Sequence, residues 1–492
     1  MDFDKRNWRM LIDGQFVDAK AFRDIVNPSN NRVIARAPEA DSADVQRALA
    51  AARRSQSEWK TLPAIARAAI MRRIAQLIRR EAETLAHIVV SEQGKPISEA
   101  RGEVGGAAEF FDYFAEFARR IEGQILPSDA RDEQIWIQRV PVGVVAGIIP
   151  WNYPAALVSR KVAPSMIAGD AIALKPHELT PLSALFMAEL FVEAGTPPGV
   201  VNILTGSGAA VGEALVRSPI VDLVTMTGSV PTGKRIMAAA AEDMKPVSLE
   251  LGGKAPFIVM PDADLELSVR SAITSRFMNC GQVCICNERT FVHTDVYDEF
   301  LERFLEGVRA LRLGDPMLEA TDVGPKVSRG ELEKVEAHVS RAVSQGARLL
   351  IGGERPNRPP VEGGNWYLPT VLTETRPDMS IMRDEIFGPV VPIARFKHFE
   401  EAVTAANDSR YGLSAYVFTN DMQKIMRVVR DVDFGEVYVN RIGPESLQGF
   451  HVGYRQSGVG GDDGAAGLEI YLKKKTVYVN YSGVPATTLM PY

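Results

Sequence analysis

The chain has 492 residues, a formal net charge of −6 and 46% apolar residues, values typical of a large globular protein of about three domains. This balance gives no reason to expect nucleic acid or a membrane surface as a partner. The polar start lacks the apolar core of a secretory signal, and no apolar run approaches the roughly 20 residues of a membrane span. Three cysteines do not make a disulfide scaffold, so free thiols and a cytoplasmic location are expected.

The first part of the chain is expected to be mainly helical. Helical spacing of apolar residues predicts two helices over 42–90 and a third, with an aromatic stripe, over 98–122. From Val142 the pattern changes to short apolar runs separated by helical stretches. These runs lie at 142–149, 171–174, 201–204, 221–226 and 247–251, and then at 257–260, 290–292, 390–393 and 436–439. Such alternation predicts an α/β fold with two parallel, doubly wound sheets, each covered by helices on both faces.

All three cysteines lie in one segment, 277–289, in which Gly281-Gln282-Val283 precedes Cys284. An ionised thiol is a strong nucleophile, and small residues beside it leave room for a substrate. The alternatives are that the cysteines are core residues, which is common for free cysteine, or that they bind a metal. A Cys-x3-Cys-x-Cys run without a nearby histidine pair is a poor zinc site, so no metal is expected.

Two upstream motifs add a carboxylate and an amide. Glu250 lies inside the apolar run 247–251, which two glycines follow, and an unpaired carboxylate in an apolar strand is costly unless it has a function. Asn152 stands in Pro150-Trp151-Asn152-Tyr153-Pro154, where it is either a turn residue or a donor to a developing alkoxide.

Together these motifs resemble the aldehyde dehydrogenase superfamily, and the resemblance covers nearly the whole chain. It implies that Cys284 is the nucleophile, that Glu250 is the general base for thioester hydrolysis, and that Asn152 stabilises the oxyanion with the Cys284 N–H. It further implies an NAD-binding Rossmann-like domain, a catalytic domain, and a small extension whose strands, expected at 134–138 and 473–480, serve oligomerisation. The NAD-binding domain is expected to consist of residues 1–127 and 140–253 and of the segment 448–468, which returns to it. The catalytic domain is expected at 254–447, and the oligomerisation strands at 128–139 and 469–492.

The same resemblance distributes the cofactor site over several motifs. Lys175 and Glu178 are expected at the adenosine ribose, where a carboxylate favours NAD over NADP. The segment 227–233 follows a strand and opens a helix, whose backbone amides can meet a pyrophosphate. Glu385 and Phe387 are expected to hold the nicotinamide ribose and ring. The full set of expected cofactor residues is Pro150, Trp151, Lys175, Glu178, Gly228, Ser229, Gly233, Leu251, Gly252, Glu385 and Phe387.

Within the superfamily the chain most resembles the bacterial lactaldehyde and glycolaldehyde dehydrogenases, through segments such as 113–116, 281–284 and 448–451. The residues implied at the substrate end are Arg160, Glu445, His451 and Tyr153, polar groups that suit a short hydroxyaldehyde. Arg160 could instead bind a carboxylate through two parallel hydrogen bonds, so a succinate-semialdehyde dehydrogenase is the alternative. Tyr153, Ala155 and Ala156 depart from the hydroxyaldehyde pattern and indicate a roomier tunnel.

Further alternatives are a CoA-acylating relative, against which Glu250 argues, and a non-catalytic binding protein, against which the complete motifs argue. The expected partner is a small aldehyde, and the expected assembly is a homo-oligomer, a dimer or a tetramer. Cys286 lies two positions after Cys284, so it either forms a reducible bridge with it or lines the site.

Overall fold

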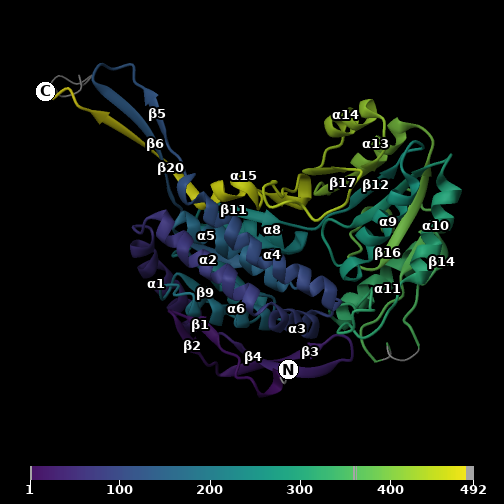
Figure 1. Cartoon of the computed structure of the whole chain (residues 1–492), viewed down its shortest axis with the longest axis horizontal. Coiled ribbons are helices and arrows are strands. Elements are labelled where there is room, and N and C mark those ends of the chain that lie inside the picture. The colour runs from purple at the N-terminus through teal and green to yellow at the C-terminus, as the bar shows by residue number, and fades with distance from the viewer. Residues whose placement is uncertain (1–2, 358–360, 362, 484–492) are drawn as a thin grey trace.

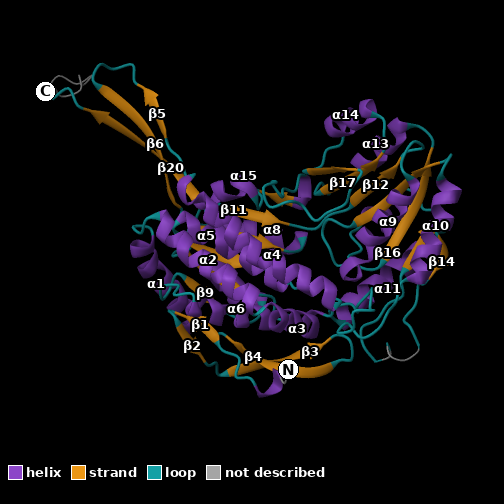
Figure 2. Ribbon diagram, viewed as in Figure 1, coloured by secondary structure: helices purple, strands orange, loops and turns teal. Residues whose placement is uncertain are grey.

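The computed structural model describes residues 3–357, 361 and 363–483. It has two lobes, each built around a sheet, and an arm of long strands that projects from the first lobe (Figure 1). Figure 2 shows helices on both faces of the sheets, so the predicted α/β class is confirmed. None of the described helices combines the length and the hydrophobicity needed to cross a membrane.

The first lobe contains an eight-stranded sheet in the order β19-β11-β10-β7-β8-β9-β1-β2. Its five central strands are parallel, as predicted: β7 (Val144–Ile148), β8 (Ala171–Lys175), β9 (Val201–Ile203), β10 (Leu223–Thr227) and β11 (Val247–Glu250). Three short antiparallel strands, which the apolar runs did not indicate, extend its edges: β1 (Met10–Ile12), β2 (Gln15–Val17) and β19 (Gly458–Val459). The covering elements are α5 (Pro154–Ala168), α6 (Leu182–Glu193), the π-helix η3 (Gly208–Gly212), α7 (Glu213–Arg217) and α8 (Val230–Ala241).

The N-terminal region forms three helices over 42–93, where two were expected. These are α1 (Ser42–Trp59), α2 (Ala64–Arg80) and α3 (Ala82–Gln93), followed by α4 (Ile97–Ala115) and the short η2 (Glu116–Arg119). The first break falls at Pro63, whereas the second is a single non-helical residue, Glu81, with no glycine or proline to signal it. The aromatic stripe of α4 is buried at Phe111 and Phe114, so it is core. The chain begins with η1 (Phe3–Lys5) and, after β2, forms a ribbon of β3 (Ala21–Asn27) and β4 (Arg32–Glu39).

The second lobe contains a seven-stranded sheet in the order β14-β15-β16-β13-β12-β17-β18, parallel except for β14. Its strands are β12 (Ala255–Val259), β13 (Asn287–His293), β14 (Arg348–Ile351), β15 (Thr370–Thr373), β16 (Val390–Phe396), β17 (Ser414–Phe418) and β18 (Glu436–Val439). Of these, β14, β15 and β17 were not among the predicted runs. The helices are α9 (Leu265–Phe277), η4 (Met278–Gly281), α10 (Tyr297–Ala310), α11 (Arg329–Ser344), α12 (Ser380–Arg383), α13 (Phe399–Asn407) and α14 (Met422–Asp431).

The arm is an antiparallel sheet of β5 (Gln124–Pro127), β6 (Glu133–Pro141) and β20 (Leu472–Asn480), in the order β20-β6-β5. The two predicted strands therefore pair with each other, and a third strand, β5, joins them from within the segment expected to belong to the cofactor domain. Ile125 and Tyr478 are more than half exposed on this arm. Before β20 the chain forms η5 (Arg455–Ser457), α15 (Gly464–Leu468) and η6 (Glu469–Tyr471). Residues 484–492 of the expected extension lie outside the described residues.

The strand order of the first sheet determines where a site can form. From β7 the chain proceeds to β8 and β9 on one side, and then crosses to β10 and β11 on the other side. In an open parallel sheet, the crevice at the carboxyl ends of strands at such a reversal is the usual ligand site. The segment 448–468 returns to this sheet, because β19 pairs with β11.

Candidate active site

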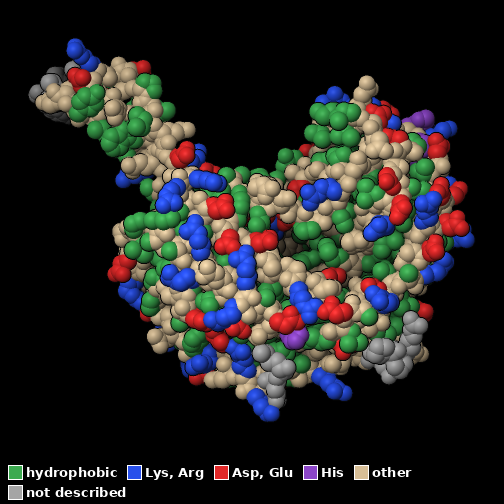
Figure 3. All heavy atoms as spheres, in the orientation of Figure 1, with side chains coloured by type: hydrophobic (Ala, Val, Ile, Leu, Met, Phe, Trp, Pro, Cys, Tyr) green, Lys and Arg blue, Asp and Glu red, His purple; other side chains and the backbone are tan. Residues whose placement is uncertain are grey.

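Four of the sequence motifs meet at one edge of the first sheet. The pairing register places Ile148 beside Lys175 and Met226, and Thr227 beside Glu250. Each motif continues from the carboxyl end of its strand, so the segments that carry Asn152, Glu178 and Gly228 lie at the same edge as Glu250. Figure 3 shows the surface hollowed between the two lobes, with acidic and basic side chains interspersed around it.

The cysteine loop, which consists of η4 and the residues between it and β13, has an unusual backbone. Asn279 and Cys280 have φ of 49° and 56°, and Gly281 follows with 69°. A Cβ on Gly281 would collide with the Gly388 carbonyl, so this position requires glycine. The buried Arg276 donates to the Gly281 and Asn287 carbonyls at 3.1 and 2.9 Å. The Arg276 guanidinium therefore holds the backbone conformation of the loop that carries Cys284.

Cys284 is the one cysteine of the three that is not fully buried. Burial raises the pKa of the Cys280 and Cys286 thiols to about 12, so neither ionises near neutral pH. The sulfur of Cys286 points to the Gly281 carbonyl at 3.7 Å. These environments favour Cys284 as the reactive thiol and Cys286 as a residue that lines the site.

A buried ion pair anchors the proposed oxyanion residue. Lys95 Nζ donates to the Asn152 carbonyl at 2.9 Å and lies 2.6 Å from Glu103, and both charged side chains are fully buried. Glu103 in turn accepts from the Ala155 N–H at 2.8 Å, at the start of α5. The amide of Asn279 also donates to the Asn152 carbonyl, at 3.0 Å. Asn152 is thus fixed to α4, α5 and the cysteine loop together.

The side chains of Asn152 and Tyr153 face the cysteine loop. Asn152 Nδ2 donates to the Gln282 carbonyl at 3.1 Å, which uses one of its two amide hydrogens and leaves the other for an oxyanion. The ring of Tyr153 lies 3.6 Å from Lys95 Nζ, and it packs with Cys284 against the apolar cluster of Val283 and Ile285. Tyr153 therefore packs against the same cluster as the thiol.

Glu250 is buried beside the cysteine loop, and few contacts offset the cost of burying its carboxylate. Among the described residues, neither of its carboxylate oxygens has a hydrogen-bond partner, and burial raises the pKa of Glu250 to about 8. A Cβ on Gly253, three residues on, would lie 2.5 Å from the Cys284 carbonyl, so the two loops are in close contact. A carboxyl group that exchanges a proton near neutral pH next to a nucleophile suits a general base.

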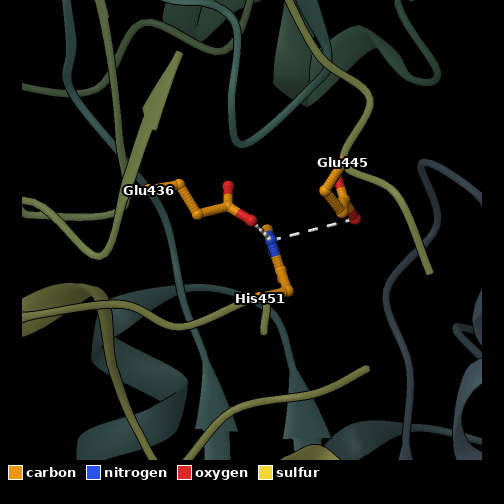
Figure 4. A group of neighbouring side chains, drawn as sticks. All are labelled: Glu436, Glu445 and His451. Carbon is orange, nitrogen blue, oxygen red and sulfur yellow. Dashed lines mark hydrogen bonds and ion pairs between the residues drawn. The ribbon is translucent and has the colours of Figure 1, made fainter. Parts of the chain in front are cut away.

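The three predicted substrate residues Arg160, Glu445 and His451 form one cluster. Arg160 donates to Asp463 through Nε at 2.9 Å and through Nη2, and Nη2 also donates to Glu445. Burial alone would raise the pKa of Glu445, but His451 and Arg160 outweigh it and lower the value to about 2. His451 Nε2 lies 3.5 Å from Glu250. Figure 4 shows Glu436, which the sequence did not single out, and Glu445 beside the imidazole.

The residues expected at the dinucleotide form two groups. In the first, Lys175 Nζ lies 3.3 Å from Glu178, and Gly228 donates its N–H to the Glu250 carbonyl at 2.9 Å. Ser229 precedes α8, and within the described part of the chain no side chain caps that helix. A Cβ on Gly233 would lie 2.7 Å from the Leu251 methyl groups. Uncapped amides at the start of α8 and a close glycine suit a pyrophosphate.

The second group, expected at the nicotinamide, brings both lobes together. Glu385 accepts from the Gly253 N–H at 2.8 Å, and a Cβ on Gly252 would collide with its carboxylate. Burial raises the pKa of Glu385 to about 8. Trp151, which follows Pro150 at the end of β7, meets the Phe387 ring edge-to-face at 5.4 Å. The residues of both groups therefore fit a dinucleotide that runs along the edge of the first sheet and reaches the second lobe.

The arrangement matches a known family. The family model described as the aldehyde dehydrogenase family covers residues 16–477. The chain belongs to this family. This aldehyde dehydrogenase is an oxidoreductase that uses NAD or NADP.

Individual relatives match the aldehyde dehydrogenase over almost its full length. The 3,6-anhydro-alpha-L-galactose dehydrogenase of Vibrio sp. (strain EJY3) is 47% identical over 478 residues, covering 97% of this chain and 100% of the relative. The lactaldehyde dehydrogenase of Escherichia coli (strain K12) is 45% identical over 475 residues, covering 96% and 98%. A solved structure of 3,6-anhydro-L-galactose dehydrogenase in complex with NADP has a TM-score of 0.95 at 46% identity, covering 96% and 100%.

The sequence missed several residues that shape the site of this aldehyde dehydrogenase. Lys95, Glu103 and Asn279 hold Asn152, and Glu436 contacts His451. Glu103 follows Ala100 and precedes Val104 and Ala107 on the buried face of α4. The charged Glu103 on an apolar helix face could therefore have been recognised from the sequence as a buried polar residue. Glu436, at the start of a strand, gave no such signal.

Proposed function

We propose that the enzyme oxidises a short hydroxyaldehyde, of the lactaldehyde or glycolaldehyde type, to its carboxylic acid with NAD. The observation that carries this substrate class is the saturated charge of Arg160, which two carboxylates, Glu445 and Asp463, already balance. A cation so paired has little to gain from a third carboxylate, but the cluster still offers hydrogen bonds to a hydroxyl group. This argues against the alternative, succinate semialdehyde.

In this proposal, the chemistry begins at Cys284. Its thiolate forms a C–S bond with the aldehyde carbon, and the carbonyl oxygen becomes an alkoxide that Asn152 and the Cys284 N–H stabilise. Bound NAD supplies the hydride acceptor, which leaves the substrate carbon on Cys284 as a thioester. Glu250 then removes a proton from water, and the resulting hydroxide attacks the thioester carbon. A C–O bond forms, the C–S bond breaks, and the carboxylic acid and the Cys284 thiolate are released.

A larger polyhydroxylated aldehyde is the second candidate substrate. Ala155 and Ala156 lie in the first turn of α5, which begins at Pro154 directly after Tyr153, and their small side chains favour a roomier site. A relative that is 47% identical is named for 3,6-anhydro-α-L-galactose, which supports a site of this size. Lactaldehyde, glycolaldehyde, succinate semialdehyde and 3,6-anhydrogalactose should therefore be compared by NADH formation. Turnover that is fastest on the semialdehyde would overturn the proposed class.

For the cofactor we propose NAD, because the Glu178 carboxylate would repel a 2′-phosphate. The related 3,6-anhydro-L-galactose dehydrogenase was solved in complex with NADP, so the ratio of kcat/KM for NAD and NADP is the direct test. A Glu178→Gln variant is expected to move this ratio toward NADP. An unchanged ratio would contradict the proposed role of Glu178.

The remaining proposals concern the reaction type, the assembly and the setting. Transfer of the acyl group to coenzyme A added to the assay would indicate the CoA-acylating class, and alkylation of Cys284 without NADH formation on any aldehyde would indicate a binding protein. We propose the division given by the sequence into a cofactor domain, a catalytic domain and an oligomerisation extension, which β5 also joins. We also propose a cytoplasmic location and a homo-oligomer, a dimer or a tetramer, formed through the arm. Light scattering on Tyr478→Glu should show a smaller species if the arm forms the interface.

A further inference from the structure

Phe387, the residue expected at the nicotinamide ring, has a strained backbone. Its φ of 51° lies in the left-handed region, which a residue with a bulky side chain rarely adopts. Its half-buried ring meets that of Trp151, from the first lobe, edge-to-face at 5.4 Å. Because such a conformation persists only where its surroundings hold it, the contacts of the Phe387 backbone identify what fixes the ring.

Two buried charged side chains bind the polar groups of this backbone. One oxygen of Glu288 accepts the Phe387 N–H at 3.1 Å, and the other accepts the Ile386 N–H at 2.9 Å. Lys326, which precedes α11, donates from Nζ to the Phe387 carbonyl. Its Nζ also lies 5.8 and 5.9 Å from the centroids of the Trp151 and Phe387 rings, within the range of cation–π attraction. Phe387 is thus fixed through the peptide group before it and the peptide group after it.

The two charges differ in how they are compensated. Glu288 lies 2.7 Å from Lys254 Nζ and 3.0 Å from Arg276 Nη1. Burial alone would raise the pKa of Glu288, but these cations outweigh it and lower the value to about 2. Lys326, in contrast, takes part in no ion pair within the described part of the chain, and burial lowers its pKa to about 8. A buried ammonium group without a carboxylate is costly, so stability alone does not explain a lysine at this position.

The same segment is attached to the cysteine loop. Arg276 donates to the carbonyls of Gly281 and of Gly388, the residue after Phe387. A Cβ on Gly281 would lie 2.3 Å from the Gly388 carbonyl oxygen, so the two segments touch with no room for a side chain between them. A ring that is fixed at Phe387 is therefore also fixed relative to the loop that carries Cys284.

We propose that Lys326 is a positioning residue for the cofactor. It bonds the Phe387 carbonyl while Glu288 bonds the Phe387 N–H, and it thereby keeps the ring where it can hold the nicotinamide. This inference rests on the cofactor role proposed for Phe387 and names the side chain that fixes it. Lys326 acts through Phe387 alone, so the adenosine end of the cofactor, expected at Lys175 and Glu178, does not depend on it.

Two ligands that differ only in the nicotinamide separate this role from a general effect on the fold. NADH and ADP-ribose share the adenosine, the pyrophosphate and the second ribose, and NADH alone carries the nicotinamide ring. The ring of NADH is uncharged, and both ligands carry the same pyrophosphate charge. The ratio of the two Kd values therefore reports the position of the ring and cancels a simple effect of the Lys326 charge.

The test is isothermal titration calorimetry of the full chain with each ligand. Lys326→Met removes the donor to the Phe387 carbonyl and should weaken NADH binding about tenfold, with ADP-ribose binding unchanged. Lys334→Met, the same substitution at an exposed lysine of α11, is the matched control and should follow the wild type for both ligands.

A second pair of variants tests whether Lys326 acts through Phe387. Phe387→Ala should weaken NADH binding relative to ADP-ribose at least as much as Lys326→Met does. Adding Lys326→Met to Phe387→Ala should change the ratio no further, because the ring that the lysine holds is already gone.

Several outcomes would overturn the proposal. These are an unchanged ratio in Lys326→Met, an equal loss of both ligands in a folded variant, or a further loss in the double variant. Should Lys326→Met not fold, as judged by thermal unfolding, Lys326→Gln supplies the comparison, because its shorter side chain should also release the carbonyl. An unchanged ratio in Phe387→Ala would refute the cofactor role of Phe387 and the role of Lys326 with it. Binding does not depend on turnover, so a failure of the proposed oxidation would appear separately, as absent NADH formation beside the expected ratios.

Discussion

The two sides of Cys284 are built in opposite ways. On the oxyanion side, Asn152 is held by hydrogen bonds from Lys95 and Asn279, and the charge of Lys95 is matched by Glu103. On the base side, the oxygens of Glu250 lack hydrogen-bond partners among the described residues. A hydrogen-bond network in which every group has a partner fixes the position of a side chain. A buried carboxyl group with few partners instead has a raised pKa, so it can exchange a proton near neutral pH. In the proposed mechanism, one side therefore supplies geometry and the other supplies proton transfer.

The largest effect is expected on the base side. Glu250→Gln should slow hydrolysis of the thioester by roughly 100- to 10,000-fold, while one equivalent of NADH still forms rapidly. Stopped-flow absorbance would show this burst followed by a slow steady state. Cys284→Ala is the matched control, because it should show neither phase. A Glu250→Gln enzyme with a normal steady-state rate and no burst would break the comparison.

On the oxyanion side the chemical step itself should fail. Asn152→Ala removes a donor to the alkoxide and should reduce kcat by on the order of 100- to 1000-fold. Unlike Glu250→Gln, it should abolish the burst, because the slow step now precedes NADH formation. A burst that survives in Asn152→Ala would show that the two sides do not divide the reaction in this way.

The anchoring of Asn152 can be tested through stability. Lys95→Met leaves Glu103 buried without its partner and should lower the free energy of unfolding by about 3–5 kcal/mol. Adding Glu103→Gln, which keeps an acceptor for the Ala155 N–H, should recover much of this loss in a denaturant titration. Activity should recover less than stability, because Asn152 still lacks the Lys95 hydrogen bond. Equal recovery of both would mean that the pair only stabilises the fold.

The smallest predicted effect is a pH dependence. The base must be deprotonated to act, and burial raises the pKa of Glu250 to about 8. The rate of thioester hydrolysis should therefore rise with pH, about tenfold per unit on the acidic limb, and level off above that pKa. Single-turnover kinetics at several pH values would measure it. A flat profile through this range would indicate that another group activates the water.

Much of the fold was readable from the sequence, because buried parallel strands are continuous apolar runs. The run 436–439 coincides with β18, and the five central strands of the first sheet all appeared. The predictions failed where the local signal was absent. Glu81 interrupts two helices without glycine or proline, and β1, β2 and β19 are too short to produce a pattern. Such elements depend on tertiary pairing, which a local sequence window does not contain.

The site divides in the same way. Cys284, Glu250 and Asn152 could be predicted as site residues because each lies in its own recognisable motif. The residues that support them were not, since Lys95 lies 57 positions before Asn152 and Glu436 lies 15 positions before His451. A carboxylate that opens a strand resembles a solvated charge until the partner strand and the returning segment are in place. Positioning residues are therefore the part of the site for which three-dimensional information is needed most.

The pairing of β19 with β11 also sets an order of events during synthesis. The thiol loop and the strand that ends in Glu250 leave the ribosome well before the segment 448–468 that contains His451. Until that segment folds back onto the first sheet, Glu250 lacks His451, whose Nε2 lies 3.5 Å from the Glu250 carboxylate in the finished fold. The growing chain would thus complete the surroundings of its proposed base late, once most of the fold is in place.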